Sequence, residues 1–316
     1  MKSQEELTLL VDIARMYYEE GAKQSDVAQT FNISRSLVSK YLKRAREEGI
    51  VEITIHDEFV YPHRKLVKKL KLKYGLDDVV CITSQPSKSV QRRQTGKAAG
   101  QYLMKKIRKE SIVGVSAGKT LHEVATTVSR TSSYPDTVFV PLTGGMGTQH
   151  TDIQSNVICK LFSQRLQSKE IDLHAPLLTD TEEAKTMVMQ QSFVKDVFNK
   201  AKEADFALVG IGGVPAYNDV SEAYLHKINP NTNTENPEII GDICYNFLNE
   251  NGKLVDCEWN KRVISLDLES LRSIPLVIGV AEGIEKVNAI HAAIKGNLID
   301  VLVTDSDVAE ALLSKE

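Results

Sequence analysis

Cysteine, long apolar runs and an excess of charge of one sign are all scarce in this sequence. The four cysteines are widely spaced and form no C-x-x-C pair, so neither a zinc ribbon nor a disulfide framework is expected. They are Cys81, Cys159, Cys244 and Cys257. The longest apolar run, Ile274 to Ala281, is too short to span a bilayer. Five acids among the first twenty residues argue against a targeting peptide, so we expect a cytoplasmic protein with reduced thiols.

The length of 316 residues is enough for two domains, or for one small module beside a larger one. Apolar residues make up 42% and charged residues 26%, which argues against an intrinsically disordered chain. The net charge of −3 excludes a uniformly cationic nucleic-acid binder and leaves local basic patches open. Pro62 stops any continuing element near 56–62, so we divide the chain into residues 1–55, a linker with a helix over 56–75, and a domain over 76–316.

Short β-branched runs alternate with helical stretches in the larger, C-terminal part. The runs cover residues 79–82, 112–115, 138–140, 206–209, 276–280 and 301–303. Near-continuous apolar strands separated by helices are typical of a parallel sheet that is covered on both faces. The predicted fold class is therefore α/β, with an all-α module followed by a Rossmann-like, mostly parallel sheet.

The N-terminal part has apolar residues at helical spacing over 6–18, 26–31 and 35–48, which predicts three helices. Ser25 and Ser34 are expected to cap the second and third helices, and Asn32 to adopt the left-handed conformation of a tight turn. The positions expected to be buried are Val27, Ala28, Phe31, Ile33, Val38, Tyr41 and Leu42. Two short helices across a tight turn, with a small residue where they approach, form the helix-turn-helix pattern.

The third predicted helix is strongly basic. Residues 34–46 contain five basic residues and no acid, and polar side chains cluster at the start of the helix. A recognition helix in the major groove has this character, so we predict an interface with operator DNA. Its predicted residues are Gln24, Ser34, Arg35, Ser36, Ser39, Lys40, Lys43 and Arg44, the last two on phosphates. The alternative is a plain helical bundle with a solvated basic face.

Two segments follow the predicted helix-turn-helix. Residues 51–55 alternate apolar and polar side chains, which predicts a half-exposed strand or wing. Residues 64–73 contain six basic residues and no acid, with leucine and valine between them. This helix either adds phosphate contacts or docks on the larger domain as a solvated linker, and the pattern leaves both open.

The loop after the strand at 112–115 resembles a nucleotide-binding loop but fails its spacing. Gly114 and Gly118 bracket three residues, whereas a Walker A loop needs four. A small-residue loop at a helix N-terminus still presents free backbone N–H groups and the positive end of a dipole, which suits a single phosphate. The alternative is a tight strand-to-helix turn without a ligand.

Glycine-bearing loops also follow three further strands, at residues 141–147, 210–213 and 281–283. The carboxyl ends of parallel strands lie on one edge of a sheet, so these loops predict a common ligand there and disfavour a scaffold without one. Lys286 supplies charge for an anion, although a lone lysine on a helix is more often only solvated. Asp242 either accepts hydrogen bonds from sugar hydroxyls or serves as a cap or turn residue.

The whole chain resembles the SorC/DeoR type of bacterial transcriptional regulator. The matching features are the helix-turn-helix over 24–42, the loop 114–120, Pro141-Leu-Thr-Gly-Gly, Gly210-Ile-Gly-Gly, Gly241-Asp-Ile, and the block from Val280 to Asp305. The resemblance implies an effector domain similar to ribose-5-phosphate isomerase and glucosamine-6-phosphate deaminase. It also implies a phosphorylated sugar effector and a homo-oligomeric (dimeric or tetrameric) repressor of a carbohydrate-catabolic operon. The implied effector residues are Ser116, Gly118, Lys119, Thr120, Thr143, Gly144, Gly145, Gly212, Asp242, Glu282 and Lys286.

Glu282 departs from that family's pattern, because it stands where the family usually has a second glycine. A carboxylate beside a phosphate site repels it, so either Glu282 points away or the effector differs. The competing hypothesis is a sugar-phosphate isomerase or deaminase with an added DNA-binding module. The chain has no Asp-Gly-Ala-Asp-Glu run for acid–base work, and Thr143 offers no amine for a Schiff base. We therefore predict no catalysis, and neither a cofactor nor a metal.

Overall fold

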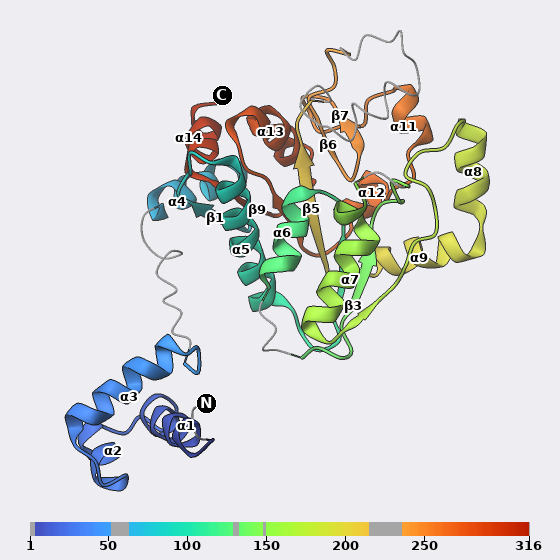
Figure 1. The fold of residues 1–316 in the computed structure, drawn as a ribbon. Coiled ribbons are helices and arrows are strands. Elements are labelled where there is room, and N and C mark those ends of the chain that lie inside the picture. The colour runs from blue at the N-terminus through green and yellow to red at the C-terminus, as the bar shows by residue number, and fades with distance from the viewer. Residues whose placement is uncertain (1–3, 52–62, 129–132, 148–149, 215–235, 316) are drawn as a thin grey trace. The chain divides into compact units, whose positions relative to one another are not determined.

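The computed structural model describes residues 4–51, 63–128, 133–147, 150–214 and 236–315. The chain divides into two compact units, Met1–Glu58 and Phe59–Glu316 (Figure 1). Each unit has a hydrophobic core of its own. In the described segments, no helix combines the length and apolarity that crossing a membrane requires.

The smaller unit contains three helices, α1 (Gln4–Tyr18), α2 (Gln24–Thr30) and α3 (Arg35–Glu47). Its core includes Ile13, Val27, Val38 and Leu42, and Ala28 is also buried between the helices. Phe31, Ile33 and Tyr41 are half-buried against the same core. The predicted helix-turn-helix packing is therefore confirmed.

Local chemistry sets the turn between α2 and α3. Asn32 has a φ of 50°, the left-handed conformation expected there. Ser34 is the N-cap of α3, and its hydroxyl oxygen accepts a hydrogen bond from the backbone N–H of Leu37 at 3.2 Å. The predicted cap at Ser25 is wrong: the chain is extended at Lys23 and turns into helix at Gln24, so Ser25 already lies in the first turn. The predicted wing lies almost wholly outside the described residues.

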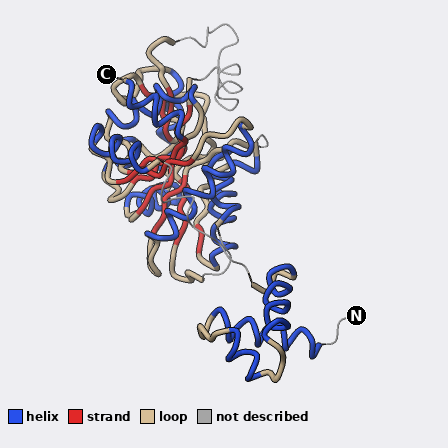
Figure 2. The backbone as a smooth tube through the Cα atoms, turned by 90° about the vertical axis from the view of Figure 1, so that its left-hand side faces the viewer, coloured by secondary structure: helices blue, strands red, loops and turns tan. Residues whose placement is uncertain are grey.

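The larger unit is a parallel sheet between two layers of helices (Figures 1 and 2). The strand order is β1-β9-β8-β5-β2-β3-β4, with all neighbours parallel, and β6 and β7 extend β5 as an antiparallel flap. The strands are β1 (Asp78–Ile82), β2 (Ile112–Val115), β3 (Val138–Pro141), β4 (Lys169–Glu170), β5 (Phe206–Gly212), β6 (Gly241–Ile243), β7 (Asn246–Leu248), β8 (Val277–Val280) and β9 (Val301–Asp305). All six predicted strands are present, whereas β4, β6 and β7 were not predicted, because two or three residues give no readable periodicity.

The helices of this unit pack on the two faces of the sheet and beside the β6–β7 hairpin. They are α4 (Arg64–Tyr74), α5 (Lys88–Lys106), α6 (Lys119–Thr127), α7 (Ser155–Leu166), α8 (Glu182–Gln190), α9 (Ser192–Lys202), α11 (Glu258–Arg262), α12 (Leu268–Arg272), α13 (Val287–Lys295) and α14 (Ser306–Ser314), with 3₁₀ turns η2 (Thr151–Ile153) and η4 (Ile284–Lys286). Core residues of α5, α6 and α7 cover one face. Core residues of α4, α9, α12, α13 and α14 cover the other.

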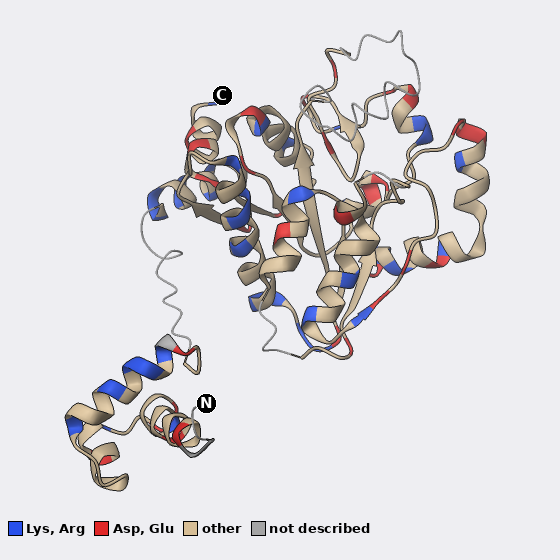
Figure 3. Cartoon of the chain, viewed as in Figure 1, with Lys and Arg blue, Asp and Glu red and all other residues tan. Residues whose placement is uncertain are grey.

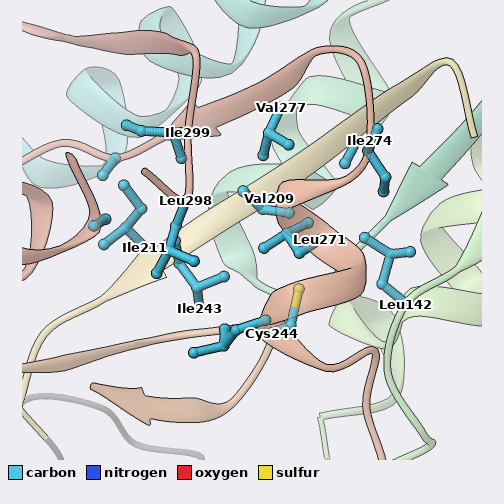
Figure 4. Close-up of a cluster of buried hydrophobic side chains, with 14 of the residues drawn as sticks. Leu142, Val209, Ile211, Ile243, Cys244, Leu271, Ile274, Val277, Leu298 and Ile299 are labelled. Atoms are coloured by element: carbon cyan, nitrogen blue, oxygen red, sulfur yellow. The ribbon is translucent and has the colours of Figure 1, made fainter. Parts of the chain in front are cut away.

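Alternation along β5 explains why its sequence is apolar throughout. Ala207, Val209 and Ile211 point into one core, and Leu208 points into the other. Figure 4 shows the first core, where Val209 and Ile211 lie among residues of α12, the β6–β7 hairpin and the segment before β9. A strand that packs on a core at both faces is predominantly apolar, which confirms the interpretation of these runs as central strands.

The basic helix α4 belongs to the larger unit. Leu70 is fully buried in its core, and Val67 and Tyr74 pack beside it. Arg64, Lys65, Lys68 and Lys69 are exposed. Of the two alternatives expected for this helix, the structure shows docking on the larger domain. Its charged face remains on the surface.

Candidate functional site

The exposed face of α3 carries most of the residues predicted to contact DNA. Ser34, Arg35, Ser36, Ser39, Lys40 and Lys43 are all exposed, and Gln24 at the start of α2 is half-buried. Figure 3 marks basic residues in blue along α3. Arg35 and Lys40 do not belong to the hydrophobic core of this unit, so their side chains can contact a partner.

Arg44 is the exception among these residues. Its guanidinium donates to Glu6 of α1 at 2.5 Å and to Glu48 at 2.6 Å. These hydrogen bonds raise the pKa of Arg44 above its ordinary value. Arg44 therefore ties α1 to the end of α3, and the structure gives no support to its predicted contact with phosphate.

A cavity of about 450 Å³ opens at the carboxyl ends of β1, β2, β5, β8 and β9. It lies at the sheet edge that the strand-end loops predict. Eight of the eleven predicted effector residues line it: Ser116, Gly118, Lys119, Thr120, Gly212, Asp242, Glu282 and Lys286. The topology brings them together from loops that are far apart in the sequence.

Thr143, Gly144 and Gly145 do not line this cavity, so the structure does not support their predicted contact with an effector. The loop is instead tied to the backbone of two other segments: Gly144 N donates to the Ile264 carbonyl at 2.9 Å, and Gly145 pairs with Pro176. A Cβ on Gly144 would lie 2.2 Å from the Pro176 carbonyl oxygen. This glycine is explained by close backbone packing and needs no ligand.

One side of the cavity carries groups that can interact with an anion. Gly118 caps α6 with a φ of 133°, a conformation that side-chain-bearing residues rarely adopt. The first turn of α6 then directs its backbone N–H groups and its positive dipole end to the cavity wall. Lys286 lines the same cavity from η4. Its side chain lies beside Gly213, where an added Cβ would be 3.8 Å from Lys286 Cγ.

The β6–β7 hairpin forms another side of the cavity. Asp242 is buried, and its carboxylate accepts a hydrogen bond from the backbone N–H of Tyr245 at 3.1 Å. Cys244 and Tyr245 have φ values of 50° and 60°, which fit a two-residue turn but strain residues other than glycine and asparagine. Asp242 is thus a turn residue that also lines the cavity, so both predicted roles are compatible. Burial raises the pKa of the Cys244 thiol, which disfavours its reactive thiolate form.

Glu282 lies in the cavity wall and does not point away from it. It is 8% exposed, and both carboxylate oxygens accept from the Thr120 hydroxyl, at 3.0 and 3.1 Å. Arg92 Nε lies 3.4 Å from Oε1. Burial raises the pKa of Glu282, and Lys286, Thr120 and Arg92 oppose that effect in part. The repulsion expected of this carboxylate is therefore balanced locally by cationic groups.

Sequence reasoning missed the residues that the β1 end contributes. Ser84 and the α5 residues Lys88 and Arg92 line the cavity, but the loop after β1 contains no glycine and so gives no sequence signal for a ligand. The sequence analysis also missed Asp305. Its carboxylate accepts hydrogen bonds from Ser84 Oγ at 3.0 Å, Gly283 N at 2.9 Å and Val308 N at 3.1 Å. Asp305 thereby anchors the segment that carries Glu282 and Lys286.

The cavity combines donors for an anion with carboxylates that can accept from hydroxyls. Nowhere in the described ranges do three or more His, Cys, Asp or Glu side chains gather so as to hold a metal ion. A helix-turn-helix unit joined to an α/β unit with a polar cavity at its sheet edge defines a class, the ligand-responsive transcription regulators.

Comparisons with known proteins specify that class. Residues 61–314 match a protein family described as "Putative sugar-binding domain". The sorbitol operon regulator of Klebsiella pneumoniae is 29% identical over 316 residues, covering 99% of this chain and 100% of the regulator. The deoxyribonucleoside regulator of Bacillus subtilis (strain 168) is 29% identical over 320 residues, covering 98% of each. The crystal structure of full-length SorC from Klebsiella pneumoniae has a TM-score of 0.85, with 99% of this chain and 100% of that chain covered.

The chain belongs to the SorC/DeoR-type family of sugar-binding transcriptional regulators. The family expected from the sequence motifs is therefore confirmed, and so is the α/β fold with its N-terminal helical module.

Proposed function

We propose that this protein represses a carbohydrate-catabolic operon and that a phosphorylated sugar in the sheet-edge cavity controls its affinity for operator DNA. In this proposal residues 1–55 bind DNA, 56–75 connect, and 76–316 bind the effector and form the oligomer. A ligand that favours one DNA-binding state shifts the equilibrium by its differential affinity, so an inducer lowers operator affinity.

The observation that supports this proposal is that the cavity lining contains two kinds of polar group. The N-terminus of α6, Arg92 and Lys286 offer donors and positive charge, while Asp242 offers a carboxylate. A sugar phosphate presents the complementary groups, an anion at one end and hydroxyls along the rest. We assign the phosphate to Gly118–Thr120 and Lys286, and the hydroxyls to Asp242.

Calorimetry on the full-length protein tests this assignment, with sugar phosphates titrated against their unphosphorylated parents. The phosphates should bind more tightly, and Lys286→Ala should lose that preference while keeping DNA binding. Lys295→Ala is the matched control, because Lys295 ends α13, is exposed and does not line the cavity. Equal affinity for phosphate and parent would contradict the phosphate assignment. An undiminished response in Lys286→Ala would contradict the role of that lysine.

Homo-oligomerisation is part of the proposal. One helix-turn-helix contacts too few base pairs for operator specificity, and two-fold operators require paired modules. We therefore expect a dimer or tetramer in light scattering, both free and on DNA. A monomer in both states would refute this expectation.

The proposal assigns no catalytic activity to the cavity. Acid–base catalysis needs a carboxylate placed to exchange a proton with the substrate. Glu282 is engaged by Thr120 and Arg92, and Asp242 accepts from the backbone of its own turn. Turnover of pentose or hexose phosphates by the purified protein would favour the isomerase or deaminase hypothesis instead.

A further inference from the structure

Glu282 lies where the proposed effector is expected to place its anionic group. Thr120 is the second residue of α6, so its hydroxyl belongs to the helix N-terminus that a phosphate would approach. Both oxygens of Glu282 share the single proton of that hydroxyl. The buried carboxylate thus already occupies a donor at the positive end of the helix dipole.

Arg92 is the second group that Glu282 occupies. The guanidinium lies against the carboxylate in the cavity wall, with Nε 3.4 Å from Oε1. Arginine is also a preferred partner of phosphate, because its planar fork matches paired anionic oxygens. Both side chains that hold Glu282, Thr120 and Arg92, line the cavity and are therefore also candidate partners for a phosphate that enters it.

We propose that Glu282 is an internal competitor for the anion subsite, which a phosphorylated ligand must displace from Thr120 and Arg92. The inference rests on the proposed function, because it assumes that the ligand carries an anionic group. The neighbouring backbone is held in place, since Gly283 N donates to Asp305 at 2.9 Å. The carboxylate therefore leaves by rotation of its own side chain. Glu282 lowers affinity for weakly anionic ligands and reserves the site for those that can displace it.

Inorganic phosphate is the probe that tests this inference, titrated by calorimetry into the full-length protein. Glu282→Gln keeps the shape of the side chain and removes its charge. We expect it to bind phosphate about tenfold more tightly than the wild type, because like charges in close contact oppose each other strongly.

Glu310→Gln is the matched control, because it removes the same charge outside the site. Glu310 is exposed and does not line the cavity. We expect its phosphate affinity to stay within about twofold of the wild type. Trp259 fluorescence in urea reports whether each variant is folded, and Glu282→Ala provides the same comparison if Glu282→Gln does not fold.

A double-mutant cycle with Arg92→Met tests whether Glu282 and phosphate share the arginine. Removal of Arg92 should cost more phosphate affinity in the Glu282→Gln background, where the guanidinium is released, than in the wild type. Additive effects would overturn the competition at Arg92.

The remaining outcomes separate this inference from the proposed function. If the wild type binds phosphate and Glu282→Gln binds it no better, Glu282 does not compete, and only this inference is wrong. If Glu282→Gln binds phosphate more weakly, Glu282 supports the ligand and the inference is likewise overturned. If neither protein binds phosphate or any sugar phosphate, the anion subsite does not exist and both proposals fail.

Discussion

Loss of the Asp305 carboxylate should destabilise the larger unit and loosen the wall of the cavity. Asp305 is 2% exposed and accepts hydrogen bonds from Ser84 Oγ, Gly283 N and Val308 N. In Asp305→Ala, Ser84 keeps Ser306 Oγ as a partner at 3.0 Å, so two backbone donors carry most of the cost.

The magnitude follows from those two donors. Val308 N lies in the first turn of α14, and loss of such a cap costs about 1 kcal/mol. Gly283 N is half-buried and is left without its acceptor, which costs about 1 kcal/mol more, the lower end of the range for such groups. We therefore expect Asp305→Ala to lower the free energy of unfolding by about 2 kcal/mol.

Urea unfolding followed by tryptophan fluorescence measures this change. The chain has one tryptophan, Trp259, which is 1% exposed and packs in the larger unit, so the signal reports that unit alone. Asp307→Ala is the control: its side chain is exposed in the same turn, and its loss should cost less than about 1 kcal/mol. If Asp305→Ala is no less stable than Asp307→Ala, Asp305 does not anchor this wall.

Three further predictions concern the helix-turn-helix and the buried carboxylate. Arg35→Ala and Lys40→Ala should each weaken binding to a DNA fragment selected from random sequence by about 1–3 kcal/mol. The affinity for sugar phosphate should stay unchanged. Unaltered gel shifts in both variants would show that α3 does not contact DNA. Ser34→Ala should lower the free energy of unfolding of the smaller unit by about 1 kcal/mol, because Leu37 N loses its acceptor. Ser34→Asp restores a capping side chain and should recover this free energy. An equal loss in both variants would contradict the capping role. Because burial raises the pKa of Glu282 above the ordinary 4.5, the folded state binds its proton more tightly than the unfolded state does, so the wild type should lose stability relative to Glu282→Gln as the pH rises through and above 4.5. Thermal melts of the two proteins check this, and a difference that is constant with pH would show that the carboxylate titrates normally.

Local signals in the sequence are enough to predict several elements of this fold. Asn32 and Ser34 specify the turn and the cap of α3 through their own backbone and side-chain preferences. The apolar runs specify the central strands, because a strand that packs on a core at both faces is predominantly apolar. The carboxyl edge of the sheet as the ligand side follows from the parallel order of such strands, and the cavity lies there.

The tertiary structure alone decided which loops share the cavity and how their charges pair. The loop at Gly144 follows a central strand and carries glycines like the others, yet contact with Pro176 assigns it to packing. Thr120 and Glu282 are separated by 162 positions, and their hydrogen bond depends on the strand order that places β2 and β8 on either side of β5. The sequence predicts a phosphate contact for Arg44, and the packing of α1 on α3 adds the ion pair with Glu6. Residue types and spacing carry local conformational preferences, whereas these pairings arise when chain crossovers bring distant side chains within a few ångströms.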